Sequence, residues 1–525
     1  MTVEARDPGR QGRSVDLRRH GLLAAVCLLL TVPFWFVKFP PMQDLPVHTA
    51  TIRVLHDFGD PASGFRKDYR LTLGRTQYVG FYALGHLLAY VTTARGAVVL
   101  LACFYLVGTL LALRALLRAL GRDPWLCLAA IPGLYGATFG IGLLTYLSAF
   151  PVTLYALALL VRKREKPTVL LHVATAFLAV ALFYLHIIHL AIFFLGAFVL
   201  FPFRGTKKAM AAWIAALLPS VAAVLWWLTM TNIGRRILEV STSWGRTARP
   251  PIGGLLIDVV PWIADAYVDP TDEIVFGVLI VVLVIATRHV AKTGTRALRA
   301  PAFAFVPAVL FFLYMTGERS HGPIWPLCQR YVLPAWLLAI PLFALPEAPA
   351  VRRKFVAALV AVSILTVANV SWHFVTFDRA ARGIDGAIAH MEPGKRVANL
   401  IYKPAVWPFR FSPLLHVGSN YQTDKGGVVM FTFAGYDQWP FDFLPDRYPL
   451  FDGPAAPRWE FNPDVVAASH PLATRFDYVV AYDRRDYPLP PGFRRTWTDG
   501  TWEVLVPCPD CPPGGPATTS ATDAP

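Results

Sequence analysis

Charged residues are scarce in this chain. Only 16% of its 525 residues are Asp, Glu, Lys or Arg, and 55% are hydrophobic, whereas soluble proteins carry about 25% charged residues. Mostly apolar runs recur between Leu22 and Phe377, and they reach the roughly 18 residues that a membrane-spanning helix needs. The scarcity of charge therefore excludes a wholly soluble protein and predicts a polytopic membrane protein that is mainly α-helical.

Several signatures of other functions are missing. Cys508 and Cys511 form a CPDC motif, but no second ligand pair for zinc stands nearby, so they form a disulfide or remain free thiols. The C-terminal part contains no GxGxxG or P-loop nucleotide-binding motif. Apolar segments such as 98–113 and 355–370 hold no charged residue, which argues against ion or solute transport.

The charge that is present is mainly positive and is distributed in short clusters. The chain has 49 Lys and Arg against 34 Asp and Glu, a net charge of +15. The clusters are Arg114–Arg122, Arg162–Lys166, Arg204–Lys208, Arg288–Arg299 and Arg352–Lys354. Because they alternate with apolar runs, the positive-inside rule explains them and no nucleic-acid partner is expected.

Twelve segments are candidate spans, namely 21–38, 76–94, 97–119, 125–142, 143–162, 168–186, 187–203, 209–230, 272–290, 301–317, 331–346 and 353–375. If all of them cross the membrane, every basic cluster falls on the outer side. If segment 76–94 does not cross, every cluster moves inside, as the positive-inside rule requires. That segment is also the most polar, with Gln77, Gly80, Gly85 and His86. We therefore expect about 11 transmembrane helices plus outer juxtamembrane helices.

This topology divides the chain into four parts. Residues 1–20 form a cytoplasmic tail before a first helix without a small-x-small cleavage site. Residues 21–377 form the transmembrane domain, with an outer first loop at 39–96. Residues 378–507 are predicted to form an extracytoplasmic α/β domain, with strands at 396–403, 428–434, 476–483 and 502–507. Asp499-Gly500 predicts a hairpin turn, and residues 508–525 are expected to be disordered.

The segment after the first span carries the most informative motif, Gln43-Asp44-x-Pro46-x-His48. Asp44 stands just beyond the predicted membrane boundary, where a partly desolvated carboxylate is suited to deprotonate a hydroxyl. An Asp before a Pro at a helix start is also an ordinary N-cap, and the two roles are compatible. His48 follows four residues later on the same helix face, where it orients Asp44, binds a phosphate or is simply a surface histidine.

Further candidates lie at the predicted outer turns. Arg319, His321 and Arg330 stand before the span 331–346, and cations at this place suit a lipid phosphate. Arg330 also begins a helix, whose N-terminus favours anions. Interfacial anchoring beside aromatic residues explains the same cations. His186 and His189 occupy another outer turn, where a histidine is either part of a site or a marker of the interface.

With these residues and this topology the chain resembles the GT-C superfamily of integral-membrane glycosyltransferases, which includes the protein O-mannosyltransferases and the lipid A aminoarabinose transferases. The resemblance covers nearly the whole chain. It implies transfer of a sugar from a polyprenyl-phosphate donor to a lipid, glycan or protein acceptor at the outer face of the cell (inner) membrane. Asp44 matches the first-loop acid that acts as the general base. Arg319, His321, Arg330, His48, His186 and His189 are the candidate substrate-binding residues.

The chain departs from the superfamily pattern in one respect. Many relatives carry paired acids in the first loop, whereas this chain has Gln43-Asp44 only. A lone carboxylate is a poor site for a divalent metal, so no metal ligand and no cofactor is assigned, and Asp57, Asp60 or Asp68 would have to supply a second acid.

Two other functions fit the same composition. One is a non-catalytic membrane protein that assembles or anchors envelope polysaccharide machinery. The other is a polymer ligase, although the key basic residues of such ligases usually lie in a large loop between late spans, and here the large soluble part is C-terminal. Replacing Asp44 by Asn separates an enzyme, which loses activity, from an anchor, which loses little.

Overall fold

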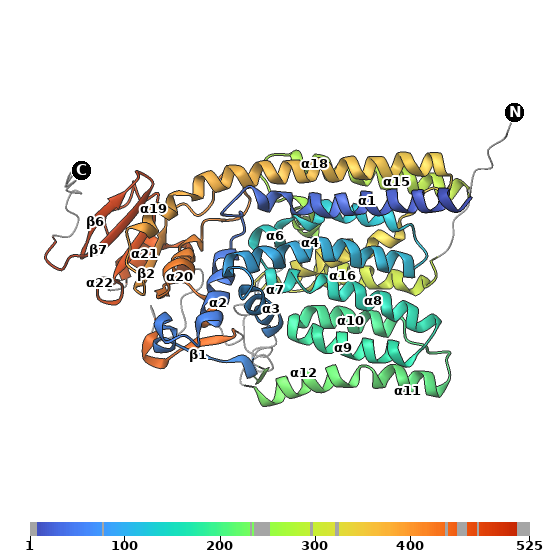
Figure 1. Ribbon diagram of the computed structural model, residues 1–525, viewed down its shortest axis with the longest axis horizontal. Coiled ribbons are helices and arrows are strands. Elements are labelled where there is room, and N and C mark those ends of the chain that lie inside the picture. The colour runs from blue at the N-terminus through green and yellow to red at the C-terminus, as the bar shows by residue number, and fades with distance from the viewer. Residues whose placement is uncertain are drawn as a thin grey trace.

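A computed structural model gives the fold of the protein. It describes residues 8–75, 78–231, 234–235, 252–293, 298–320, 325–435, 439–448, 459–469 and 472–511. Long helices run side by side along the longest axis of the molecule, and the five-stranded sheet gathers at the end that holds the C-terminus (Figure 1). The N-terminus lies at the opposite end.

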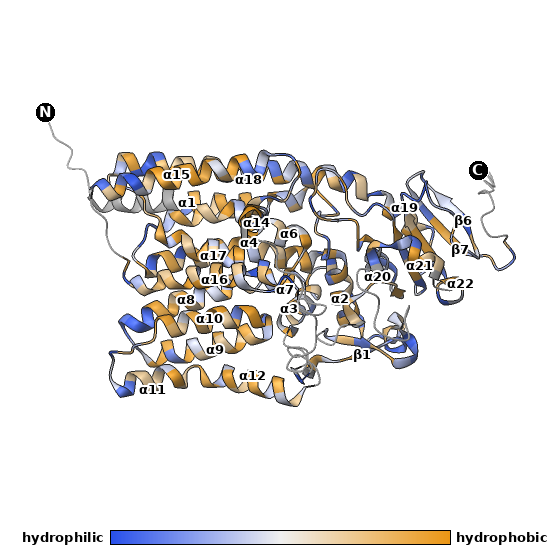
Figure 2. Ribbon diagram, turned by 180° about the vertical axis from the view of Figure 1, so that it is seen from behind, coloured by the Kyte–Doolittle hydropathy of each residue, from blue (hydrophilic) through white to orange (hydrophobic). Residues whose placement is uncertain are grey.

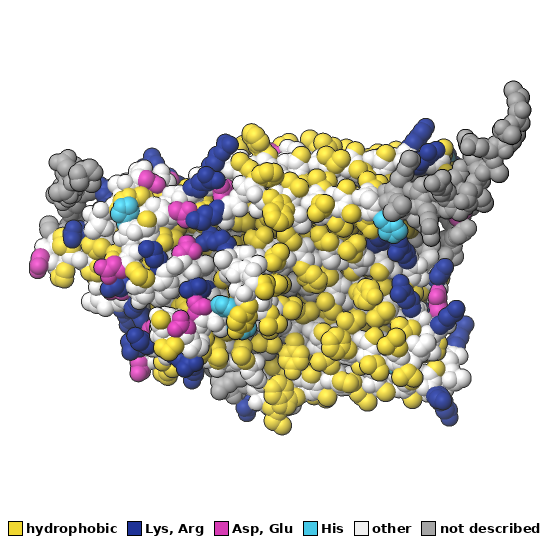
Figure 3. All heavy atoms as spheres, in the orientation of Figure 1, with side chains coloured by type: hydrophobic (Ala, Val, Ile, Leu, Met, Phe, Trp, Pro, Cys, Tyr) yellow, Lys and Arg dark blue, Asp and Glu magenta, His cyan; other side chains and the backbone are white. Residues whose placement is uncertain are grey.

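The long helices follow the apolar runs of the sequence. They are α1 (Pro8–Trp35), α4 (Ala94–Ala119), α8 (Phe150–Glu165), α9 (Val169–Leu185), α10 (Ile187–Val199), α11 (Lys207–Ala215), α12 (Leu218–Met230), α14 (Ile252–Ala264), α15 (Thr271–Thr293), α16 (Phe305–Thr316), α17 (Val332–Ala339) and α18 (Pro349–Ala381). Their central parts are hydrophobic and several of their ends are hydrophilic (Figure 2). On the face in Figure 3, hydrophobic side chains cover the middle of the molecule, and Lys and Arg gather toward both ends, where those at the end with the C-terminal part are mixed with Asp and Glu. This surface is that of an integral membrane protein.

The number of complete spans is smaller than the number of apolar runs. Among the described residues, four helices are long and apolar enough to cross a membrane: Ala94–Ala119, Leu144–Glu165, Thr271–Thr293 and Pro349–Ala389. Helices α11 and α12 add a fifth if this pair, bent by 43°, is one broken span. Shorter apolar helices of 10–17 residues accompany them. The expected count of about 11 therefore depends on short and broken spans, and it stays a prediction.

Segment 76–94 contains a short helix, α3 (Val79–Ala89), of 11 residues. At 1.5 Å per residue it is about 16 Å long, roughly half the thickness of the hydrocarbon core. Its Gly85 packs against Ile52 of α2 (Leu45–Asp57), so closely that a Cβ on Gly85 would lie 2.3 Å from the Ile52 Cδ1. Because predicted spans such as 331–346 also contain helices this short, the statement that segment 76–94 does not cross the bilayer stays a prediction.

The predicted span 125–142 is not one helix. It consists of a 3₁₀ segment (Pro124–Ala130), α5 (Ile131–Leu134) and α6 (Ala137–Ile141), and α7 (Leu144–Leu147) follows. Gly142 ends α6 with a φ of +84°, in the left-handed region that favours glycine. Because the helix is broken here, the carbonyl groups of Gly140 and Ile141 accept hydrogen bonds from the first loop. The donors are the N–H groups of Gln43 and Asp44, each at 3.0 Å.

Several basic clusters meet at one end of the molecule. Arg352 at the start of α18 forms an ion pair with Asp123, which follows α4. The Arg299 N–H donates to the Leu120 carbonyl at 3.2 Å. The five-stranded sheet lies at the other end (Figure 1), so the basic turns and the C-terminal part face opposite sides of the helical body.

The C-terminal lobe (residues 383–511) contains a mixed sheet. Strands β2 (Arg396–Ile401), β3 (Val428–Val429), β5 (Tyr478–Tyr482), β6 (Phe493–Thr498) and β7 (Trp502–Pro507) follow the order β3-β2-β5-β7-β6. β2 is parallel to β3 and β5, and β7 is antiparallel to β5 and β6. Helices α19 (Gly383–Ala389), α20 (Asn420–Lys425), α21 (Pro463–Ser469) and α22 (Leu472–Arg475) complete the lobe. All four predicted strands are confirmed, although the second keeps only two residues, and the Asp499-Gly500 turn joins β6 to β7.

A small second sheet joins the first loop to the C-terminal lobe. β1 (Tyr69–Leu71) pairs antiparallel with β4 (Phe441–Phe443), and Arg70 forms a 2.7 Å ion pair with Asp442. Gln422 also donates a 2.8 Å hydrogen bond to the Tyr69 hydroxyl. The first loop and the lobe therefore lie at the same end of the molecule, although more than 300 residues separate them in sequence.

The chain end differs from the prediction of disorder from residue 508 onward. Cys508 and Cys511 form a disulfide, and the Cys508 N–H donates to the Gly492 carbonyl at 2.7 Å. These contacts hold residues 508–511 against the loop before β6, so the prediction is wrong for these four residues. Residues 512–525 lie outside the described residues.

Candidate active site

Asp44 occupies the N-cap position of α2, but its side chain does not cap the helix. Its Oδ1 instead accepts a 2.9 Å hydrogen bond from Nδ1 of His416. The backbone at Asp44 has φ −92° and ψ −5°, unlike the extended conformation of a usual N-cap. The side chain keeps 11% of its surface exposed. The sequence-based N-cap reading is therefore wrong for the carboxylate, which points to the C-terminal lobe.

His416 belongs to the loop that leads into α20 and is buried. Its ring stacks on Phe431, with 3.8 Å between ring centroids and 8° between planes. A carboxylate can only accept, so the hydrogen bond to Asp44 assigns the proton to Nδ1. The other nitrogen, Nε2, is buried and has no hydrogen-bond partner among the described residues.

His48 lies one turn after Asp44 and faces α3 and the α6–α7 turn. Its Nε2 donates to the Gly142 carbonyl at 3.1 Å, since a carbonyl can only accept, and Nδ1 accepts from the Tyr82 hydroxyl at 2.8 Å. Burial lowers the pKa of His48 to about 4, although the charge of Asp44 opposes this. His48 is therefore neutral at pH 7. Direct binding of a ligand would require it to give up one of these two contacts.

Aromatic side chains from both parts of the chain surround His48. Trp439 of the C-terminal lobe stacks on its ring at 5.9 Å between centroids and donates a 3.1 Å hydrogen bond to the Thr51 hydroxyl. Burial raises the pKa of Tyr82 well above its usual value, and the charge of Asp44 adds to the effect. This packing gives α2 a fixed position against the lobe.

Arg330 is a cation whose charge acts on Asp44. It lies in the 3₁₀ turn Cys328–Tyr331 before α17, within electrostatic range of the Asp44 carboxylate. Its guanidinium lies 5.8 Å from the centroid of the Tyr146 ring, and Nη1 is 3.3 Å from Nε2 of His186. Its Nε is buried without a hydrogen-bond partner among the described residues.

His186 and His189 lie at the turn from α9 to α10. His186 Nδ1 accepts from the Ile188 N–H at 3.3 Å, which caps α10. His189 is fully buried, and its Nδ1 lies 2.8 Å from the Thr153 hydroxyl. His186 therefore shares the site with Arg330 and, through it, with Asp44, whereas His189 lies behind it against Tyr146, at 4.7 Å between centroids.

Two predicted cations are not brought to this group. Arg319 forms an ion pair with Asp258 of α14, which neutralises its charge there. His321 lies outside the described residues. Of the two cations predicted before α17 that the structure describes, Arg330 is the one whose charge acts on Asp44.

The other acids of the first loop have partners of their own. Asp57 pairs with Arg53 at 2.7 Å, at the far end of α2, about 20 Å from Asp44 at 1.5 Å per residue. Asp60 caps the short helix that follows it, and Asp68 lies 3.6 Å from Arg396. None of these contacts brings a second carboxylate to Asp44.

A cluster of three carboxylates lies elsewhere, at the start of α15. Oxygens of Asp265, Asp272 and Glu273 lie within 4.8 Å of one another. Arg410 of the lobe binds two of them, Asp265 at 2.5 Å and Glu273 at 3.0 Å. Burial raises the pKa of Asp265 to about 6, and Arg410 opposes the shift. Because the guanidinium already binds this cluster, we interpret it as an ion-pair network that ties the lobe to α15.

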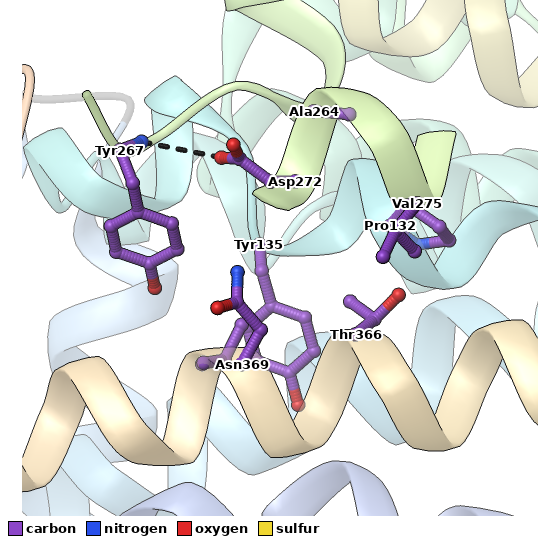
Figure 4. Close-up of a pocket in the computed structure, with 9 residues that line it drawn as sticks. Pro132, Tyr135, Ala264, Tyr267, Asp272, Val275, Thr366 and Asn369 are labelled. Atoms are coloured by element: carbon purple, nitrogen blue, oxygen red, sulfur yellow. Dashed lines mark hydrogen bonds between the residues drawn. The ribbon is translucent and has the colours of Figure 1, made fainter. Parts of the chain in front are cut away.

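A small cavity lies beside this cluster, between α5, α15 and α18 (Figure 4). Tyr135, Asp272, Thr366 and Asn369 are among the residues that line it. Its volume of about 10 Å³ is the lower limit for one water molecule. A sugar or a lipid phosphate does not fit in this cavity.

Sequence reasoning missed His416 and Tyr82. His416 stands in the stretch Pro413–Asn420 without a charged neighbour, and nothing local distinguishes it from a core histidine. Its only signal is its isolation among apolar residues. The contact with Asp44 arises from the pairing of the first loop with the lobe, which local patterns do not predict.

Comparisons with known proteins bear on the fold. No family model matches the chain, and no curated protein matches it. Among solved structures, ArnT from Cupriavidus metallidurans in the apo state aligns over 94% of this chain and 98% of its own, with a TM-score of 0.51 and 12% identity. The same protein bound to undecaprenyl phosphate aligns over 92% and 97%, with a TM-score of 0.55 and 11% identity. The chain has the fold of ArnT. The predicted resemblance is confirmed at the level of the fold.

Proposed function

We propose that this protein is a membrane glycosyltransferase that moves a sugar from a polyprenyl-phosphate donor to a lipid, glycan or protein acceptor. The ArnT fold supports the class, and one of the two ArnT structures contains undecaprenyl phosphate. The observation that carries the proposal is a geometric one: His416 holds the Asp44 carboxylate at 2.9 Å, the Asp44 backbone is bound to the α6–α7 turn, and Tyr146 of α7 donates to the Arg330 carbonyl. A base and a cation at one place are what transfer from a phosphate leaving group requires.

In the proposed reaction Asp44 is the general base. As the acceptor oxygen bonds to the anomeric carbon, its proton passes to the Asp44 oxygen that His416 does not hold. The bond between the anomeric carbon and the phosphate oxygen breaks, and the electron pair leaves with the polyprenyl phosphate. Arg330 neutralises the negative charge on that phosphate.

The hydrogen bonding around Arg330 supports a role in phosphate binding. His186 faces a donor at each ring nitrogen, the Ile188 N–H and Arg330 Nη1, both at 3.3 Å. A neutral imidazole has only one acceptor nitrogen, so one of these contacts is unsatisfied. The unpartnered Arg330 Nε adds a further donor. An anionic oxygen would supply the acceptor that this group lacks.

The remaining predicted residues have supporting places in this proposal. His189 and Tyr146 hold His186 and Arg330 from behind, and His48 fixes α2 beneath Asp44. Arg319, already paired with Asp258, has no role in it, and His321 stays a prediction. No metal ion is required, because Arg330 provides the positive charge.

The proposed orientation follows from the charge distribution. The basic turns lie in the cytoplasm under the positive-inside rule, with about 11 spans in the inner membrane. The first loop, the C-terminal lobe and Asp44 then face the outside, where a lipid-linked donor and an envelope acceptor meet.

A donor screen tests this proposal. The purified protein in nanodiscs is incubated with radiolabelled polyprenyl-phosphate sugars and, separately, with nucleotide sugars, with an envelope extract as the source of acceptors. We expect label to leave at least one polyprenyl-phosphate sugar and none of the nucleotide sugars. Turnover of nucleotide sugars only contradicts the proposed donor. Turnover of no donor at all contradicts the proposal and favours a non-catalytic assembly protein.

A further inference from the structure

The Asp44 carboxylate is held from the C-terminal lobe. An Asp at this position normally accepts from the first turn of its own helix, which stabilises a helix by about 1 kcal/mol. Here the side chain makes no such bond and accepts from His416 instead. A local interaction is thus replaced by one that joins residues 372 positions apart.

His416 has little freedom to make any other contact. Its ring is 4% exposed and stacks on Phe431. The loop that carries it is tied to the first loop, since the Ser412 N–H donates to the Gln43 side chain at 3.4 Å. Gly418 lies so close to Asn399 of β2 that a Cβ there would fall 2.1 Å from the Asn399 Oδ1. The imidazole is therefore fixed by the lobe and aimed at a single oxygen.

We infer that His416 is a positioning residue for Asp44 in the reaction proposed above, so this inference rests on the proposed function. Its Nδ1–H holds one carboxylate oxygen and leaves the other for the acceptor hydroxyl. The ring does not touch the substrate, because its other nitrogen is buried. The C-terminal lobe thereby supplies part of the catalytic machinery, and the base reaches its working geometry only when the lobe is seated on the first loop.

The hydrogen bond has a measurable consequence. If His416 positions Asp44 without touching the substrate, loss of its N–H donor slows the chemical step and leaves substrate binding nearly unchanged. A substitution that restores a donor at the same place should then restore the rate.

Two variants separate positioning from packing. His416→Asn keeps an N–H donor near the place of Nδ1, whereas His416→Phe keeps a ring that stacks on Phe431 and removes the donor. The matched control is His390→Phe, because His390 also lies in the lobe and stacks on an aromatic ring, Trp497, at 5.0 Å between centroids. For each variant, kcat and KM are measured from pH 5 to 9 with the donor that the wild type uses.

We expect His416→Phe to lower kcat at least tenfold with KM nearly unchanged, because the carboxylate loses the donor that fixes one of its oxygens. His416→Asn should recover much of the lost kcat, and His390→Phe should match the wild type. A His416→Phe enzyme with the wild-type kcat overturns the inference, as does a loss of kcat that His416→Asn does not recover, since a packing defect alone would produce that. Failure of the proposed function is recognised separately, because the wild type itself would then turn over no donor.

Discussion

Tyr146 holds Arg330 in two ways. Its hydroxyl donates to the Arg330 backbone carbonyl, and its ring lies 5.8 Å from the guanidinium. The backbone and the side chain of one arginine are thus fixed by one aromatic residue on α7, next to His186. A guanidinium held in this way loses little conformational entropy when it binds an anion, which is a property of a preorganised site.

The first prediction concerns Arg330 as the phosphate-binding cation. Arg330→Ala should weaken binding of undecaprenyl phosphate about 10- to 100-fold, because charge-assisted hydrogen bonds contribute about 1.5–3 kcal/mol. Arg330→Lys should recover part of the loss, since it keeps the charge but not the planar fork. Binding is measured by titration of the purified protein in nanodiscs.

Arg319→Ala is the matched control for Arg330, because Arg319 precedes the same helix but is paired with Asp258. It should bind the lipid as the wild type does. Equal losses in both variants would mean that net charge at this membrane face, rather than the Arg330 site, attracts the phosphate.

The second prediction concerns the backbone under Asp44. Gly142 has a positive φ, and a Cβ there would lie 2.9 Å from the Asp44 nitrogen. Gly142→Ala should therefore destabilise the protein by about 1–2 kcal/mol and lower activity more than tenfold by displacing Asp44. Thermal unfolding and transfer assays check the two effects.

Gly277→Ala gives the comparison for this change. Gly277 lies in α15 with nothing within 4 Å of its Cβ position, so alanine should be neutral or stabilise the helix by up to about 1 kcal/mol. If Gly142→Ala behaves like Gly277→Ala, the close approach of the α6–α7 turn to Asp44 is not required.

The third prediction concerns pH-dependent stability through His48. Burial lowers its pKa from an ordinary value of 6.5 to about 4 in the folded protein, so protons bind to the unfolded state first as pH falls. Stability contributed by the neutral imidazole is complete above pH 6.5 and declines between pH 6.5 and 4, by about 3 kcal/mol at the lower limit. Melting temperatures of the wild type should fall steeply over this range.

His48→Gln tests the assignment, because glutamine hydrogen-bonds without titrating. This variant should be less stable at pH 7 but lose less stability on acidification than the wild type does. Parallel melting curves for the two proteins between pH 7 and 4 would show that another group controls the acid limb.

The sequence predicted those parts of the fold that depend on local patterns. Apolar runs located the helices, and the Asp499-Gly500 turn between apolar stretches located the hairpin of β6 and β7, because burial and turn chemistry act over a few residues. The boundary at Gly142 was predicted, but the breaks within 125–142 were missed, since a run of apolar residues looks the same whether it is one helix or several. The pairing of β1 with β4 was missed because a three-residue strand has no periodicity to detect.

In the candidate site, too, the residues with a local sequence signal were found and those placed by long-range packing were not. Asp44 was found because it stands between a span and a proline, and Arg330 because it precedes a span. His416 was not found, since its place beside Asp44 depends on how the lobe packs on the first loop. Arg319 was a false candidate. It precedes the same helix as Arg330, so the sequence could not separate the two, and only the structure shows that Arg319 is paired with Asp258.

The central claim is that Asp44 is the base of a lipid-dependent sugar transfer. The most direct measurement compares the transfer rate of Asp44→Asn with that of the wild type in nanodiscs at equal protein level, using the donor that the wild type accepts. Asparagine keeps the size of the side chain and removes the basic oxygen, so we predict a loss of 10²–10⁴-fold in kcat with undecaprenyl phosphate binding retained. An Asp44→Asn protein that transfers sugar within tenfold of the wild-type rate would contradict this account.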